Sequence, residues 1–311
     1  MTIQFHHRDS RVISPLIFWP SALGLGFLLA GLWTYRRDLL SESSPARVRF
    51  VALGPVLVAA SLATFAGEHF TEATTFVTLV PKWLPARLFI TYFVGVAHLA
   101  AALSFVARRY IRWSAIFVAL LFALIVLLLW IPGVVARPGA RMAWIVAVRE
   151  TTFSMGALAL FSTAVRDRWP ARASSLATIA RLWTGMVLIF YGIEHFIHPE
   201  YSPGVPDSQM TASWVPLPLV LAYLTGILLI AFGIAMFVRK YASSGGMLAG
   251  LLMLLLTLVL YVPQLFLAGS VSEEITAINF VADTLLFAGT MLLITKAILD
   301  SEPQPAAATT A

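Results

Sequence analysis

Nine apolar stretches, each long enough to cross a lipid bilayer, constrain this chain more than any other feature. A helix needs about 20 apolar residues to span the hydrocarbon core. Only 12% of the residues are charged, which is too few to cover a soluble domain. The sequence therefore predicts an all-α transmembrane fold. The stretches lie near 14–34, 48–68, 86–107, 113–135, 142–165, 175–196, 217–238, 244–267 and 275–297.

The basic residues predict how these spans are oriented. They gather in the loops after the first, third, fifth and seventh stretches, and such loops are cytoplasmic by the positive-inside rule. We expect a multi-pass protein of the inner (plasma) membrane, with its N-terminus outside and its C-terminus in the cytoplasm. The net charge of +6 then reflects topology, so we expect membrane lipid as a partner and no nucleic acid. These basic residues are Arg36, Arg37, Arg47, Arg49, Arg108, Arg109, Arg112, Arg166, Arg168, Arg172, Arg239 and Lys240.

The chain has no cysteine. This excludes disulfides, thiol redox relays, cysteine-ligated iron–sulfur clusters and covalently attached c-type haem. His69 and His195 show no spacing specific to b-type haem. His195 and His198 lie near Glu194 and Glu200 in a Pro-rich loop, without the spacing of a metal site. We therefore expect no intrinsic cofactor and no metal.

An internal duplication organises most of the chain. Segment 83–132 aligns with 214–263 without a gap, and Glu150–Thr151 matches Asp283–Thr284 further on. Each copy holds four spans, an even number, so both copies have the same orientation and a pseudo-twofold axis lies along the membrane normal. The non-leucine matches include Trp83 with Trp214, Pro85 with Pro216, Tyr92 with Tyr223, Gly95 with Gly226, Arg108 with Arg239, Pro132 with Pro263 and Glu68–His69 with Glu194–His195.

We therefore predict two tandem, parallel four-helix repeats and one added N-terminal helix. Residues 1–47 form the added helix and a cytoplasmic loop, the first unit is 48–168, the second unit is 169–298, and 299–311 form a disordered tail.

The repeated unit resembles the DoxX-like family of four-helix membrane proteins. The resemblance lies in the Glu-His pair that closes the first helix, the Trp-Leu-Pro loop at 83–85, the Tyr and Gly of the second helix, and the basic residues after it. It covers about 48–165 and 175–297. Members of the family include a subunit of a thiosulfate:quinone oxidoreductase and partners of membrane oxidoreductase complexes. The resemblance implies a redox-associated membrane subunit, which departs from the family in its fused double unit and additional helix.

Glu150 and Asp283 are the deepest acidic residues, about eight residues into their spans. Because charge within a bilayer is costly, such residues face protein or water. Each carboxylate could accept protons or hold a ligand, or it could tie helices together through hydrogen bonds. Glu68–His69 and Glu194–His195 end their spans at the outer boundary. They could serve proton exchange with a quinol-like head group, or anchor the helix ends.

His98 and Arg149 make the first unit more polar than the second, where Leu229 and Ala282 replace them. We expect Arg149 to pair with Glu68 or Glu150. Two alternatives stay open: a working pocket near the outer side, or a buried structural network. Trp83 and Tyr92 lie at the outer interface, where they could belong to an aromatic belt or to a loop that covers the pocket.

Two functional hypotheses follow. The first is a redox-associated subunit that binds a quinone or another lipid-soluble ligand, together with a peripheral redox protein. Its catalytic residues would be Glu68, His69, His98 and Glu150. The second is a non-catalytic membrane partner, scaffold or small-solute carrier. Residues expected to support ligand binding in the first hypothesis are Arg149, Trp83, Tyr92, Glu194, His195 and Asp283.

Overall fold

The computed structural model describes residues 14–205 and 207–301. Within these residues, nine helical segments are long and apolar enough to cross a membrane, which confirms an all-α transmembrane fold. The helices are α1 (Pro15–Thr34), α2 (Arg36–Leu39), α3 (Ala46–Val51), α4 (Gly54–Thr71), α5 (Ala73–Phe76), α6 (Arg87–Ala107), α7 (Ile111–Ile125), η1 (Val126–Trp130), α8 (Ile131–Ala136), α9 (Arg141–Val165), α10 (Pro170–Ile197), α11 (Pro218–Phe237), α12 (Ala242–Leu256), η2 (Thr257–Tyr261), α13 (Val262–Leu267) and α14 (Val271–Ser301).

The helix ends differ from the sequence prediction by a few residues. The largest extensions are at the start of α10, at Pro170, and at both ends of α14, at Val271 and Ser301. Residues 299–301 are therefore helical and do not belong to the predicted tail. The predictions for residues 1–13 and 302–311 lie outside the described residues.

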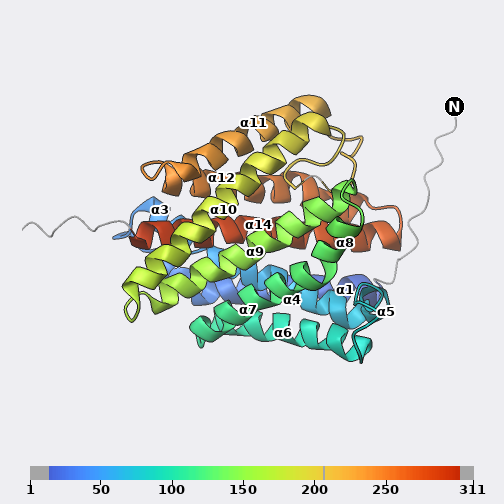
Figure 1. Ribbon diagram of the computed structural model, residues 1–311, viewed down its shortest axis with the longest axis horizontal. Helices are drawn as coiled ribbons and strands as arrows, with labels where there is room; N and C mark the ends of the chain where they lie inside the picture. The colour runs from blue at the N-terminus through green and yellow to red at the C-terminus, as the bar shows by residue number, and fades with distance from the viewer. Residues whose placement is uncertain (1–13, 206, 302–311) are drawn as a thin grey trace, which may run out of the picture.

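The most buried spans lie in the middle of the molecule (Figure 1). Helices α4, α9 and α14 run through its centre, whereas α6 lies at one edge and α11 at the opposite edge. Helix α14 packs against both α4 and α9, and α9 also packs against α10. The last helix of each unit thus contacts the first helix of the other, so the units share an interior.

Small residues allow the central helices to approach closely. A Cβ added to Gly289 on α14 would lie 2.9 Å from the backbone nitrogen of Val58 on α4. A Cβ on Gly156 of α9 would lie 2.6 Å from the Thr290 side chain on α14. Glycines at such contacts are typical of membrane helices whose backbones pack directly together. The helices are therefore so close that even short side chains of α9 and α14 can contact each other.

Local backbone features recur at positions that the gapless alignment pairs. Ala86 and Leu217 both precede their helices in the left-handed conformation, with φ of 50° and 49°. A π-helical segment precedes a proline in each unit, at η1 before Pro132 and at η2 before Pro263. The third span of each unit, α7–α8 in the first and α12–α13 in the second, is therefore interrupted at the same place.

Candidate functional site

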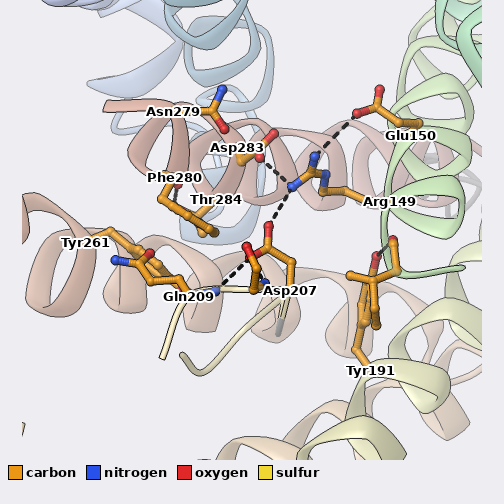
Figure 2. Close-up of polar contacts among 12 residues, drawn as sticks. Arg149, Glu150, Tyr191, Asp207, Gln209, Tyr261, Asn279, Phe280, Asp283 and Thr284 are labelled. Carbon is orange, nitrogen blue, oxygen red and sulfur yellow. Dashed lines mark hydrogen bonds and ion pairs between the residues drawn. The ribbon is translucent and has the colours of Figure 1, made fainter. Parts of the chain in front are cut away.

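Arg149 is the centre of a buried charged cluster (Figure 2). Its Nη1 atom lies 2.5 Å from Oδ2 of Asp283 and 3.4 Å from Oδ2 of Asp207. Its Nη2 atom lies 3.6 Å from Oε1 of Glu150. The four side chains are between 6% and 13% exposed, so water screens these charges little. We call Arg149, Glu150, Asp207 and Asp283 the Arg149 cluster.

The cluster joins three parts of the chain. Arg149 and Glu150 belong to α9, Asp283 belongs to α14, and Asp207 lies in the loop between α10 and α11. The Arg149 guanidinium therefore contacts its own unit through Glu150 and the other unit through both aspartates. The predicted pairing of Arg149 with Glu150 is present, but its closest partner is Asp283 and no ion pair joins it to Glu68 within the described residues.

The loop that carries Asp207 turns inward, and its residues 202–205 are buried. Three hydrogen bonds hold it in place. Arg141 donates to the Asp207 carbonyl oxygen at 2.7 Å, Tyr261 donates to the Pro203 carbonyl oxygen at 2.8 Å, and the Gly204 amide donates to Nε2 of His195 at 3.0 Å. These bonds fix the loop backbone before and at Asp207, and the Asp207 carboxylate is directed at Arg149.

Glu68 lies beside the cluster on α4. Its Oε2 accepts a hydrogen bond from Asn279 at 3.1 Å, and Asn279 precedes Asp283 by about one turn of α14. The other oxygen, Oε1, is buried and has no hydrogen-bond partner among the described residues. Glu68 thus adds a fourth carboxyl group next to the three of the Arg149 cluster, and its partner is an amide rather than a cation.

The charges of the Arg149 cluster do not balance. With every group ionised, one positive and three negative charges leave a net charge of −2. Unpaired charge costs several kcal/mol per ion in a low-dielectric interior. The cluster is therefore more stable with a bound proton or a cationic ligand than with all of its carboxylates ionised. Within the described residues, no group of three or more His, Asp or Glu side chains is arranged to hold a metal ion.

His69 and His98 form a second polar feature inside the first unit. Their ring centroids are 5.4 Å apart, and the rings meet edge to face. His69 donates Nδ1–H to the Phe65 carbonyl oxygen at 2.8 Å, whereas neither ring nitrogen of His98 has a partner among the described residues. Phe65 and Phe122 surround the His98 ring, with centroids 6.1 and 5.8 Å away. No hydrogen bond between described residues connects this pair to Glu68 or Glu150.

The remaining residues predicted to support ligand binding lie away from the Arg149 cluster or are bonded to neighbouring groups. Glu194 accepts a hydrogen bond from Arg141 at 2.8 Å, and His195 is fully buried between the Tyr191 carbonyl and the Gly204 amide. Trp83 is 70% exposed and Tyr92 is 42% exposed, as expected of interfacial aromatic residues.

Sequence reasoning missed Asp207 and Asn279. Asp207 lies in a loop, where no hydrophobic period marks the direction of a side chain. The signal that could have found it is the greater length of this loop in the second unit, in which Asp207 stands among Pro, Gly and Ser. Asn279 could have been found from its helical spacing to Asp283, since residues four apart share a helix face.

A family model described as Domain of unknown function (DUF8561) matches residues 58–135, from α4 to α8. The matched segment contains Glu68, His69 and His98 but ends before Arg149. No curated protein and no solved structure matches the chain. The resemblance to the DoxX-like family stays a prediction.

Replacing Arg149 by Leu should destabilise the protein by about 3–5 kcal/mol, because it leaves buried carboxylates without their cation. Unfolding in detergent micelles, followed by circular dichroism, measures this change. Arg108→Leu is the matched control, since its ion pair with Asp38 is close to half exposed on both sides. Exposed pairs contribute about 0–1 kcal/mol. Equal stability losses in the two variants would contradict the claim that the buried carboxylates need the Arg149 cation for stability.

Proposed function

We propose that this integral membrane protein is a carrier that exchanges protons for a small cationic solute at the Arg149 cluster. The observation that carries the proposal is the surplus of carboxylates over cations at a buried site. Either a proton or a solute cation reduces the net negative charge there, so the two compete for the same place. Competition of this kind couples proton movement to solute movement.

The surroundings of the cluster support this proposal. Carriers built from parallel repeats place their sites between the repeats, near the middle of the membrane. Arg149 lies eight residues after the start of α9, about 12 Å along the helix. With the arginine-rich loops in the cytoplasm, that depth is measured from the outer surface. The helix faces that meet at the cluster belong to different units, so a relative movement of the units would open or close it.

The interrupted helices supply candidate points of bending. The π-helical segments η1 and η2 occupy aligned positions, and π-bulges occur frequently at functional sites. Tyr261, the last residue of η2, is buried and holds the Asp207 loop through its hydrogen bond to Pro203. A change in the bend at η2 would therefore move the loop that carries one of the cluster's carboxylates.

Glu150 has the longest contact with Arg149 among the three carboxylates, so it is the group best placed to release and bind a proton. In vesicles that contain the purified protein and a trapped pH-sensitive dye, external choline or tetramethylammonium should drive proton efflux. Glu150→Gln should slow this efflux at least tenfold, whereas Glu42→Gln, at an exposed loop position, should not. Equal rates in the two variants, or no efflux with wild-type protein, would count against the carrier.

A second candidate function is a quinone site in a redox-associated membrane subunit. The His69–His98 pair favours it, because a buried imidazole with two unpartnered nitrogens can hydrogen-bond a ligand carbonyl. Phe65, Phe76 and Phe122 provide flat apolar surfaces around the pair. Such rings suit a flat aromatic head group. With this function, a peripheral redox protein would supply the electrons. Such a partnership agrees with the resemblance to the DoxX-like family.

Native mass spectrometry of the detergent-purified protein with decylubiquinone tests the second function. We expect one bound quinone on the wild type and at least a tenfold lower occupancy on His98→Leu, which removes the unpartnered nitrogens. His198→Leu is the control, because His198 lies in the loop after α10, where its Nδ1 pairs with Glu200. Unaltered occupancy in His98→Leu would reject this site.

A further inference from the structure

A polar cleft at the opposite end of the second unit has no part in the proposed transport function. It has a volume of about 50 Å³ and lies between the start of α10, the turn from α11 to α12, and the end of α14. This volume is large enough for several water molecules or one phosphate group. By the orientation predicted above, it opens at the cytoplasmic surface of the membrane. Its polar lining consists of Ser174, Thr178, Arg181, Arg239 and Ser301.

Two arginines line this cleft, and none of its lining residues is acidic. Arg181 donates to the Met236 carbonyl oxygen at 2.6 Å, which fixes its guanidinium near the end of α11. Neither Arg181 nor Arg239 forms an ion pair with a described residue. Two neighbouring positive charges without a counterion repel each other, so an anion that binds between them is favoured.

Additional contacts increase the positive character of the site. Arg166 donates to the Ser301 hydroxyl at 2.6 Å, so a third guanidinium lies one hydroxyl group away from the cleft. The neighbouring acidic residue, Asp300, is already paired: both of its oxygens lie near Lys296 Nζ, at 3.1 and 2.9 Å. Asp300, the residue before Ser301, is therefore not the missing counterion.

The first unit shows what the second one lacks. Arg108 aligns with Arg239, and there the arginine has an internal carboxylate, since its Nη1 lies 2.6 Å from Oδ2 of Asp38. Asp38 comes from α2, which follows the added N-terminal helix. The second unit has no equivalent added segment, so Arg239 has no acidic partner among residues 14–205 and 207–301 and lines the cleft. Since no described residue supplies an anion at the second position, the cleft is open to one from another molecule.

We propose that this cleft binds the phosphate of an anionic phospholipid from the cytoplasmic leaflet. Arginine suits phosphate oxygens because its planar guanidinium can donate two parallel hydrogen bonds. The hydroxyls of Ser174 and Thr178 can donate to the same group. Basic pockets between helices on the cytoplasmic side are suited to lipid head groups, and a head group lies at the depth where α11 ends. The acyl chains would extend along the apolar outer surface of the bundle.

Native mass spectrometry of the full-length protein in detergent with phosphatidylglycerol tests this inference. Wild type and Arg109→Gln should retain the lipid, because Arg109 is an exposed arginine of the corresponding loop in the first unit. Arg239→Gln should lower its occupancy at least tenfold, and phosphatidylcholine should bind weakly to all three proteins. Thr178→Leu fills the cleft and keeps both arginines, so it should also lose the lipid. This second variant keeps the test decisive if Arg239→Gln fails to fold.

Inorganic phosphate is the second probe. If it binds wild type but not Arg239→Gln, and phosphatidylglycerol does not compete with it, the phosphate chemistry of the site holds but the source is soluble. The proposal is overturned if phosphatidylglycerol binds equally to wild type, Arg239→Gln and Thr178→Leu, or if wild type binds neither probe.

Discussion

The ion pair between Arg149 and Asp283 is the interaction on which the centre of this structure depends. It joins α9 of the first unit to α14 of the second at a separation of 2.5 Å, in a region where an unpaired guanidinium would be very costly. Gly156 and Gly289 keep α14 close to α9 and α4, which places short aspartate and longer arginine side chains within reach of one another. The pair therefore requires the shared interior of the two units, and it also stabilises that interior.

Charge is distributed unequally between the two ends of the molecule. Towards the N-terminal end of α9, carboxylates outnumber the one guanidinium of the Arg149 cluster. In the cleft at the other end of the second unit, Arg181 and Arg239 form no ion pair with a described residue. We propose that each end is completed by a group of opposite charge, a proton or cation at the first and a phosphate at the second. Both ends depend on a departure from exact duplication: Ala282 replaces Arg149 in the second unit, and Asp38 belongs to the added N-terminal segment, which only the first unit follows.

Hydropathy alone predicted the spans, because length and apolar composition are sufficient to define a helix in a bilayer. The depth of Glu150 and Asp283 likewise marked them as residues of interest. Alignment of the repeats paired these two residues as equivalents, but equivalence does not show contact, so the ion pair that Arg149 forms with Asp283 was not predicted. Asp207 was missed because a loop path depends on tertiary hydrogen bonds, here those of Arg141, His195 and Tyr261.

The central claim is that the buried carboxylates hold a proton, because the single positive charge of Arg149 does not neutralise all of them. Infrared spectroscopy measures it most directly, because protonated carboxyl groups absorb apart from carboxylates. The wild-type protein in detergent at neutral pH should show a protonated-carboxyl band that resists exchange into heavy water. The band should be lost in the Glu68→Gln/Glu150→Gln double variant and kept in Glu42→Gln. A wild-type protein without this band, or a double variant that retains it in full, would contradict the account.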